Sequence, residues 1–449
     1  FFPLLLILLI NISERPFINF IILFITHYYI SGVSRYLSGI SPGIFIDMIT
    51  IIVIILMIAQ LNKKKLGLRI INAFNPLTFI ALIWLTYCFL QLLNPLSTSI
   101  LGWVINVRGI GVYFLIITMI TSILLSKYED LKKFLVVWAI LSITAVLKAF
   151  IQKTFGFDFF ETKWLNEGGS STHLISSGIR YFSFFTDAAN FGSGIAFSMM
   201  IFLISSLHCS SIKYKIFFIL TSIICGYGMI ISGTRGSLTV PFTALLLFTF
   251  LSGKIKIIIF AALFLIVSLY FLKETYIGHS NSYVRRMRSV FNTEDASFVV
   301  RRENQKKLAV YLTDKPFGAG IGMSRGEVSS YKANPFFQDL PSDSWYVLIW
   351  METGIVGLVL YILILIYILI YGIFIIIFKL KSPELKGIVT SIVCGLAGVY
   401  VASYSIEIMG QFPNSFIIFI CMAIIFISPE YDKQIRLKES ESSYEELSD

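Results

Sequence analysis

Residues 354–378, GIVGLVLYILILIYILIYGIFIIIF, form a run without a single charged side chain. A helix of about 20 apolar residues is long enough to span the hydrocarbon core of a bilayer. We therefore expect this segment to cross a membrane, with the crossing beginning near Gly354. The residues before it, Trp345 to Glu352, are expected to form an amphipathic approach at the interface.

The rest of the chain is also rich in apolar residues and poor in charged ones. Its 449 residues are 56% hydrophobic and 14% charged, and its mean hydropathy is +0.82. A soluble domain has about 25% charged residues, so the composition excludes a soluble globular enzyme and a disordered chain. In lipid the backbone must satisfy its own hydrogen bonds, which favours helices. The sequence therefore predicts an all-α polytopic membrane protein with 12–13 transmembrane helices. The other apolar runs lie at roughly 1–11, 16–31, 44–61, 76–93, 103–126, 131–151, 187–207, 214–232, 236–251, 254–272, 386–408 and 413–428.

The net charge of +10 comes from short clusters of Lys and Arg between the apolar runs. Scattered clusters of this kind are orientation signals, and they argue against a nucleic-acid partner. The loops between contain few basic residues, so the positive-inside rule places the clustered loops and the C-terminus in the cytoplasm. The clusters are Lys63, Lys64, Lys65 and Arg69; Lys127, Lys132 and Lys133; Lys213 and Lys215; Lys254 and Lys256; Lys379, Lys381 and Lys386; and Lys433, Arg436 and Lys438.

Two longer segments, 152–186 and 273–344, then fall on the outer side. We expect four regions along the chain. Residues 1–272 hold transmembrane helices and the outer loop 152–186, and residues 273–344 form an outer loop subdomain. Residues 345–428 hold the last three transmembrane helices, and residues 429–449, rich in Glu and Ser, form a disordered cytoplasmic tail.

Isolated arginines near the outer edge are the first candidates for chemistry. Arg180 lies in GIRYFSFFTDAANFG, Arg235 in the short turn ISGTRGSLTVP, and Arg108 about one turn inside a helix. An ionisable group at membrane depth is costly and usually faces a cavity or a partner. A guanidinium binds phosphate oxygens in a bidentate manner, so two such arginines suit a lipid pyrophosphate. The alternatives are snorkelling to headgroups, or for Arg180 an ion pair with Asp187 or Glu161.

Two carboxylates follow the outer subdomain. Asp343, in LPSDSWY, lies where a helix begins, so it either caps that helix or acts as a general base towards a sugar hydroxyl. Glu352 either stabilises the helix or pairs with an arginine. Tyr181 and its aromatic neighbours either anchor the chain at the interface or contact a sugar.

Metal and nucleotide chemistry have no motif in this chain. The five cysteines contain no C-x-x-C pair, the four histidines form no H-x-x-x-H, and no P-loop is present. We expect no metal and no cofactor.

Four segments, in this order, carry a resemblance to a known family: RYFSFFTDAANFG, SGTRGS, KPFGAGIGMS and DSWYVLIWMETGIVGL. The chain, over roughly residues 20–430, resembles the O-antigen ligase/polymerase superfamily of bacterial membrane glycosyltransferases, in a version similar to those of Bacteroides-like bacteria. The resemblance implies a GT-C-like fold in the inner membrane, with residues 273–344 and the site in the periplasm.

The resemblance also implies an activity. The reaction would be a metal-independent, inverting transfer of a glycan from undecaprenyl pyrophosphate, with the pyrophosphate bound by Arg180 and Arg235. The acceptor would be lipid A–core in a ligase, or another lipid-linked repeat unit in a polymerase. Family ligases carry a His-Asn pair where this chain has Asp343 and Ser344, which leaves both activities open. A transporter of lipid-linked sugars is a remoter alternative, because we find no repeated halves.

The outer subdomain is strongly basic. Its arginines are expected to bind phosphates of the donor or of lipid A, or else anionic membrane lipids. They include Arg285, Arg286, Arg288, Arg301 and Arg302.

Overall fold

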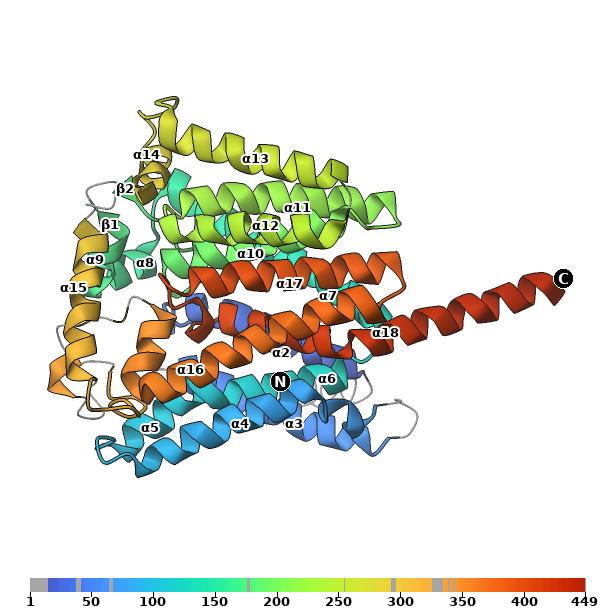
Figure 1. Cartoon of the computed structure of the whole chain (residues 1–449), viewed down its shortest axis with the longest axis horizontal. Helices are drawn as coiled ribbons and strands as arrows, with labels where there is room; N and C mark the ends of the chain where they lie inside the picture. The colour runs from blue at the N-terminus through green and yellow to red at the C-terminus, as the bar shows by residue number, and fades with distance from the viewer. Residues whose placement is uncertain are drawn as a thin grey trace.

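A computed structural model describes residues 15–37, 42–63, 68–175, 178–253, 255–291, 296–324, 334–337, 340, 342 and 344–448. In this part of the chain, eleven helices are long and apolar enough to cross a membrane. They lie side by side in one bundle (Figure 1). The structure is that of an all-α polytopic membrane protein, as the hydropathy predicts. The predicted run at 1–11 lies outside the described residues.

The helices of the bundle are α2 (Pro16–Val33), α3 (Pro42–Leu61), α4 (Pro76–Leu90), α5 (Ile100–Val107), α6 (Tyr113–Leu124), α7 (Tyr128–Phe155), α10 (Ala188–Ser206), α11 (Ile212–Ile231), α12 (Thr239–Ser252), α13 (Ile255–Glu274), α16 (Trp345–Phe374), α17 (Pro383–Ala402) and α18 (Asn414–Ser448). The elements outside it are α8 (Phe159–Trp164), α9 (Ser170–His173), β1 (Leu174–Ile175), β2 (Gly178–Ile179), α14 (Ser282–Arg288) and α15 (Ala296–Tyr311). Single 3₁₀ turns are η2 (Ile70–Ala73), η3 (Gln91–Leu93), η6 (Arg235–Leu238), η7 (Ser289–Phe291), η8 (Pro335–Phe337) and η10 (Ile408–Gly410). Wider, π-helical turns are η4 (Arg108–Val112), η5 (Leu165–Gly169) and η9 (Ile375–Lys379).

Several helices begin at residues whose side chains cap the first backbone N–H groups. Asn75 accepts a hydrogen bond from the Thr78 backbone N–H at 3.2 Å, and Pro76 occupies the first turn of α4. Ser99 caps α5 by accepting from the Gly102 N–H at 3.0 Å. Short polar side chains at these positions satisfy N–H groups that a helix leaves unpaired.

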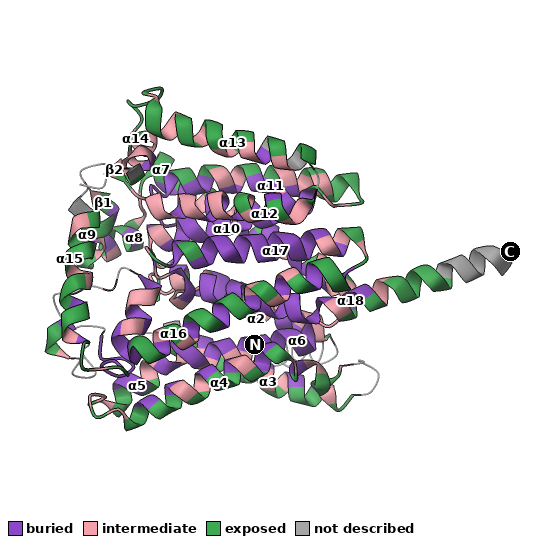
Figure 2. Ribbon diagram, viewed as in Figure 1, coloured by how far each residue is buried: buried purple, intermediate pink, exposed green. Residues whose placement is uncertain are grey.

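Helices α10, α17 and α18 form the centre of the bundle. The apolar stretches of α10 and α17 are 83% and 89% buried, against 28% for α3 at the periphery. Figure 2 shows the same contrast between these helices. Glycines let the central helices approach closely: a Cβ on Gly398 of α17 would lie 2.4 Å from the Val240 carbonyl oxygen of α12.

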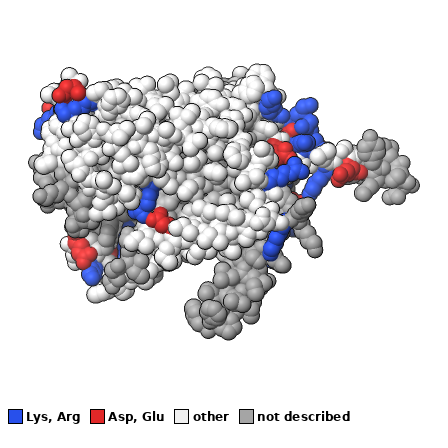
Figure 3. All heavy atoms as spheres, turned by 90° about the horizontal axis from the view of Figure 1, so that it is seen from below, with Lys and Arg blue, Asp and Glu red and all other residues white. Residues whose placement is uncertain are grey.

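The two ends of the bundle differ. On the face shown in Figure 3, basic residues gather mainly at the two ends, and the stretch between them is largely uncharged apart from one small patch of basic and acidic side chains. At the end from which α18 projects, Lys132 contacts Glu384 at 2.9 Å and Lys438 pairs with Glu129, so loops predicted to share one side do lie together. Helices α8, α9, α14 and α15 lie at the opposite end (Figure 1). Which membrane side each end faces stays a prediction.

Helix α16 is interrupted where the sequence suggests. Gly354 has φ 69° and ψ −172°, which is not helical, and it separates residues 345–353 from the long apolar stretch. The loop 316–324 packs against this interruption, with the Ala319 N–H donating to the Met351 carbonyl at 2.9 Å. A Cβ on Gly354 would lie 2.1 Å from the Pro316 carbonyl oxygen, so only glycine fits there. The glycines of KPFGAGIGMS therefore let this loop pack directly on the backbone of α16. We call the loop 316–324 and the interruption of α16 on which it packs the clasp.

The C-terminal segment differs from the expectation of disorder over residues 429–449, because α18 continues as a helix to Ser448. Its first turns beyond the membrane stretch are held by the body of the protein. Tyr431 donates to the Leu125 carbonyl, and Asp432 accepts from the Lys381 and Ser382 N–H groups at 2.9 and 2.8 Å. These contacts fix the direction in which the helix projects (Figure 1).

Candidate functional site

Arg180 comes directly after the hairpin β1–β2, and three contacts orient it. Its N–H donates to the His173 carbonyl at 2.9 Å, and its Nη1 donates to the Thr172 carbonyl at 2.9 Å. Its Nη2 donates to Thr234 Oγ1 at 3.0 Å. The guanidinium is thereby held between α9 and the turn that contains Arg235.

That turn, SGTRGS at residues 232–237, contains the start of η6 and leads from α11 towards α12. Gly233 has φ 59°, a conformation that glycine adopts without strain. A Cβ on Gly233 would lie 3.4 Å from both Arg180 Cγ and Arg286 Cδ, so the glycine sits between these two side chains. Arg286 Nε donates to the Gly233 carbonyl, and Arg235 Nη1 donates to Ser289 Oγ at 3.0 Å.

Four arginines therefore lie near one another: Gly233 separates Arg180 from Arg286, and the charges of Arg235 and Arg301 act on Arg180. We call Arg180, Arg235, Arg286 and Arg301 the arginine cluster. The pKa of Arg180 is lowered, first by burial and then by the charges of Arg235 and Arg301. The charge of Asp187 acts in the opposite direction on the same pKa. Like charges held together in a half-buried site repel one another, and an anion between them would relieve that repulsion.

Asp187 is already engaged by the backbone. It caps α10 by accepting from the Ala189 and Asn190 N–H groups at 2.7 and 2.9 Å, and from Asn190 Nδ2 at 2.7 Å. This carboxylate therefore fixes the start of α10 beside the arginine cluster, consistent with the preference for Asp at that position.

His173 supports the same loop in its neutral form. Its Nε2 accepts from the Ala188 N–H at 3.1 Å, and its Nδ1 donates to the Gly169 carbonyl at 2.8 Å. Burial lowers the pKa of His173. The ring therefore connects α9 to the start of α10 and helps to place Arg180.

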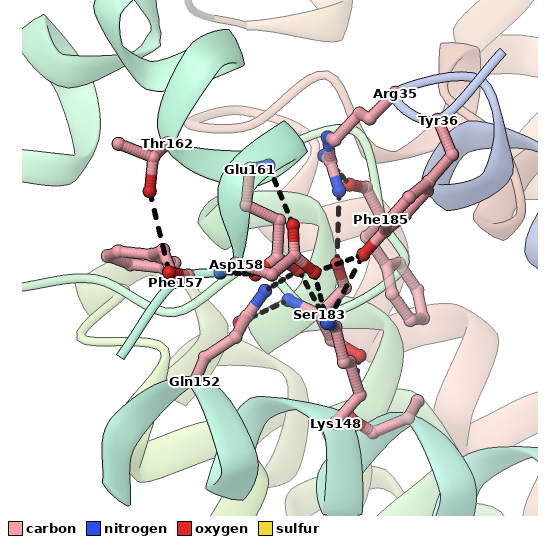
Figure 4. A network of polar contacts seen from close by, with 11 residues as sticks. Arg35, Tyr36, Lys148, Gln152, Phe157, Asp158, Glu161, Thr162, Ser183 and Phe185 are labelled. Carbon is pink, nitrogen blue, oxygen red and sulfur yellow. Dashed lines mark hydrogen bonds and ion pairs between the residues drawn. The ribbon is translucent and has the colours of Figure 1, made fainter. Parts of the chain in front are cut away.

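A polar network anchors the loop 156–187 to the bundle (Figure 4). Lys148 of α7 contacts Asp158 at 3.0 Å and the buried Glu161 at 2.9 Å. Gln152 Nε2 donates to Glu161 Oε1 at 2.8 Å, and Gln152 Oε1 accepts from the Ser183 N–H at 3.0 Å. Because a buried charge is stable only when it is paired, this network defines one position for the loop.

Arg35, in the turn after α2, completes that anchorage. Its guanidinium donates to three carbonyls of the loop: Ser183 at 3.0 Å, Thr186 at 3.1 Å, and Phe185. It also lies 4.4 Å from the ring centre of Phe182. Burial lowers the pKa of Arg35 to about 10, which leaves it charged at neutral pH. The loop of Arg180 is thus tied to the first described helix.

The segment before α16 approaches the arginine cluster from another side. Asp343 itself lies outside the described residues. Its neighbour Ser342 donates to Glu407 Oε1 at 2.5 Å, and Ser344 caps α16 and donates to the Ser403 carbonyl at 3.2 Å. The turn 403–407 packs on the SGTRGS turn, since a Cβ on Gly236 would lie 2.7 Å from Ser405 Oγ.

The other residues singled out from sequence are distributed more widely. Arg108 pairs with Asp47 and lines a separate cavity of about 140 Å³ with Trp345. Arg288 donates to Thr275 Oγ1 at 3.1 Å, between α13 and α14.

Three further candidates have different surroundings. Arg302 is exposed on α15. Tyr181 is buried, with its ring centre 5.9 Å from that of Phe157. Glu352 is fully buried and accepts from Ser324 Oγ at 2.6 Å, inside the clasp on α16. Within the described ranges, no three His, Cys, Asp or Glu side chains come together as metal ligands.

Sequence reasoning missed two residues that shape the site, Arg35 and Glu407. Glu407 lies in the stretch SYSIEIMGQ between α17 and α18, and hydropathy places it at the end of the apolar run 386–408. A carboxylate at the end of such a run is a signal of an outer-face role. Arg35 was visible as a lone basic residue in an otherwise uncharged loop.

Comparison with known proteins gives one match. A protein-family model described as O-antigen ligase matches residues 220–362, which include Arg235, Arg286 and Arg301 of the arginine cluster. Neither the curated proteins nor the solved structures gave a match. The matched stretch contains the SGTRGS turn, α15 and the clasp on α16.

Proposed function

We propose, from the match of residues 220–362 to the O-antigen ligase family model, that this protein transfers a glycan from undecaprenyl pyrophosphate to an acceptor at the periplasmic face of the inner membrane. The acceptor that we propose is lipid A–core, which makes the protein an O-antigen ligase. The arginine cluster is the observation that carries the proposal. It joins Arg180 and Arg235, from segments far apart in the chain, at one end of a membrane bundle.

The chemistry follows from where charge develops. The acceptor hydroxyl oxygen bonds to the anomeric carbon while the bond from that carbon to the pyrophosphate oxygen breaks, with inversion at the carbon. The pyrophosphate leaves with negative charge, which Arg180 and Arg235 stabilise at fixed positions. Because guanidinium groups supply this positive charge, the proposed reaction needs no metal ion.

The proton of the acceptor hydroxyl must also leave, and we assign it to Asp343. A carboxylate in this role typically contributes about 10²- to 10⁴-fold to the rate. Glu407 is a positioning residue, because its contact with Ser342 fixes the chain next to Asp343. Replacing Asp343 by Asn should therefore abolish transfer, whereas Glu407→Gln, which still accepts from Ser342, should lower it less.

The test uses purified protein with undecaprenyl-pyrophosphate glycan, lipid A–core and no added nucleotide, in the presence of a chelator. We expect glycan on lipid A–core, lost in Arg180→Ala and Arg235→Ala. Arg69→Ala, an exposed arginine at the opposite end, is the matched control. Lengthening of carrier-linked glycan alone would identify a polymerase. Full transfer by the Arg180 and Arg235 double variant would overturn the proposal.

A further inference from the structure

A cavity of about 140 Å³ is lined by the start of α3, by the turn η4 with its flanking residues, and by Trp345 and Phe412. It shares no lining residue with the arginine cluster. Gly43 and Ile105 in its lining are half-buried, and each lies near the start of a membrane-spanning segment. The cavity therefore lies at the edge of the membrane-spanning part, at the depth of the headgroups of one leaflet.

Arg108 supplies the charge in the lining of this cavity. Its Nε donates to the Ile105 carbonyl at 3.2 Å, and its Nη1 donates to Asp47, which also accepts from the Tyr113 hydroxyl. Among the described residues, Arg108 Nη2 has no hydrogen-bond partner. A Cβ on Gly43 would lie 3.2 Å from Nη2, so the glycine leaves room beside this nitrogen. Arg108 Nη2 can therefore donate to an oxygen of a ligand.

The ion pair between Arg108 and Asp47 limits the charge of that ligand. Asp47 offsets the charge of Arg108, so the cavity favours a ligand without net charge over a polyanion. The arginine cluster, in contrast, gathers positive charge. Two further features suit a binding site: ionisable side chains within membrane-spanning helices usually face a cavity or a partner, and π-helical turns such as η4 occur frequently at functional sites.

Three aromatic side chains line the same cavity, and they come from three separate segments. They are Tyr113 of α6, Trp345 at the start of α16, and Phe412 before α18. The ring centres of Tyr113 and Phe412 are 5.5 Å apart, with 77° between the ring planes. Aromatic faces attract ammonium groups, and several rings together recognise choline-like cations. A ligand that joins a phosphate to an ammonium group would therefore satisfy both Arg108 Nη2 and the rings.

The volume of the cavity limits how much of a ligand can enter. An apolar cavity of about 150 Å³ holds one benzene molecule. A space of this size admits the ammonium end of a lipid headgroup, with the phosphate at the mouth and the acyl chains in the bilayer. A hexose with its hydroxyl groups is larger than benzene and would not fit completely.

We propose that this cavity binds the headgroup of a zwitterionic phospholipid, such as phosphatidylethanolamine, from the leaflet at this end of the bundle. The phosphate accepts from Arg108 Nη2, and the ammonium group lies against Tyr113, Trp345 and Phe412. The bound lipid then connects α3 to the start of α16. This site goes beyond the proposed transfer reaction, because its ligand is a membrane lipid and not a substrate.

The experiment measures lipid binding to the full-length protein in detergent by native mass spectrometry. The probes are dioleoyl phosphatidylethanolamine and dioleoyl phosphatidylglycerol, which share their acyl chains and phosphate but differ in the ammonium group. We expect the wild-type Kd to be about tenfold lower for phosphatidylethanolamine, the effect of cation–π contacts in a sheltered site.

Two variants test the two contacts separately. Phe412→Leu removes one ring and should bring the ratio of the two Kd values towards one. Phe79→Leu, at an exposed ring of α4 that does not line the cavity, is the matched control and should keep the wild-type ratio. Arg108→Lys keeps a positive charge beside Asp47 but loses the second donor. It should therefore weaken the binding of both lipids by about tenfold.

A third variant fills the cavity without removing either contact. Gly109 lines the cavity, and a Cβ there would meet nothing within 4 Å. Gly109→Leu should therefore fold, occupy part of the cavity and abolish the preference for phosphatidylethanolamine. Gly109→Ala, which adds only one methyl group, is its matched control and should retain the preference.

Two kinds of result would overturn the proposal. One is an equal affinity of the wild-type protein for the two lipids, a comparison that needs no variant to fold, or an unchanged preference in both Phe412→Leu and Gly109→Leu. The other is binding of lipid A–core in place of phosphatidylethanolamine, lost in Gly109→Leu, which would make the cavity an acceptor site. Glycan transfer is not measured in these experiments, so their failure would leave the proposed function untouched.

Discussion

Arg180 is positioned by partners from two separate segments, the Thr172 carbonyl and Thr234 Oγ1. Lysine carries the same charge but lacks the planar fork that reaches both at once. We predict that Arg180→Lys lowers kcat/KM about 10- to 100-fold, the effect of losing one or two charge-assisted bonds. Steady-state transfer assays measure this change. Wild-type activity in Arg180→Lys would show that charge alone is sufficient.

His173 makes the loop 156–187 sensitive to acid. Its pKa is lowered by burial from an ordinary value of 6.5, so the unfolded chain binds a proton more readily than the folded one. The stability from neutral His173 is therefore complete above pH 6.5 and is lost as the pH falls towards the lowered pKa. We predict a drop in the thermal unfolding midpoint between about pH 7.5 and about pH 5.5.

The control for this effect is His173→Gln, which keeps a side-chain acceptor for the Ala188 N–H. Its unfolding midpoint should fall less than that of wild type over the same range, because one titrating group has been removed. Parallel curves for the two proteins would assign the acid sensitivity to other groups.

At the scale of elements, the clasp between the loop 316–324 and α16 depends on a very close backbone approach at Gly354. An alanine at Gly354 would need φ 69° and would overlap the Pro316 carbonyl. Strain and overlap each cost on the order of 1–3 kcal/mol. Gly354→Ala should therefore lower the free energy of unfolding by at least about 2 kcal/mol, measured by thermal unfolding in detergent. Gly109→Ala, where a Cβ meets nothing within 4 Å, is the matched control and should match wild type.

Some features of the fold and of the candidate site could be predicted from the sequence, and others depend on contacts between distant residues. Hydropathy is a local property, so the apolar helices and the interruption of α16 at Gly354 followed from it. The pairing of Arg180 with the SGTRGS turn could be anticipated because both lie at apolar-run ends on one predicted side. The roles of Arg35 and Glu407 could not, because their partners are distant in the chain. The helical tail was also missed, since its composition does not reveal the docking of Tyr431.

For the whole molecule, the central prediction is its orientation. The bundle has one end with most basic loops and another with α8, α9, α14 and α15. In a cysteine-free background, Lys307→Cys should react with an impermeant maleimide added to the periplasmic side. Lys438→Cys should react only after the inner membrane is opened. The reverse labelling pattern would contradict both the orientation and a periplasmic site.

The residues of the candidate site come from segments that are far apart in the chain, so the order of synthesis determines when the site can form. During translation Arg35 is made first, followed by the loop of Arg180. Arg235 and α15 come next in the chain, and the turn of Glu407 is made only near the end. Domains tend to form in that order during synthesis. A partly made chain lacks the late segments, so the site is incomplete until the last helices have been made. If the proposed function holds, the protein gains activity only after its membrane insertion is finished.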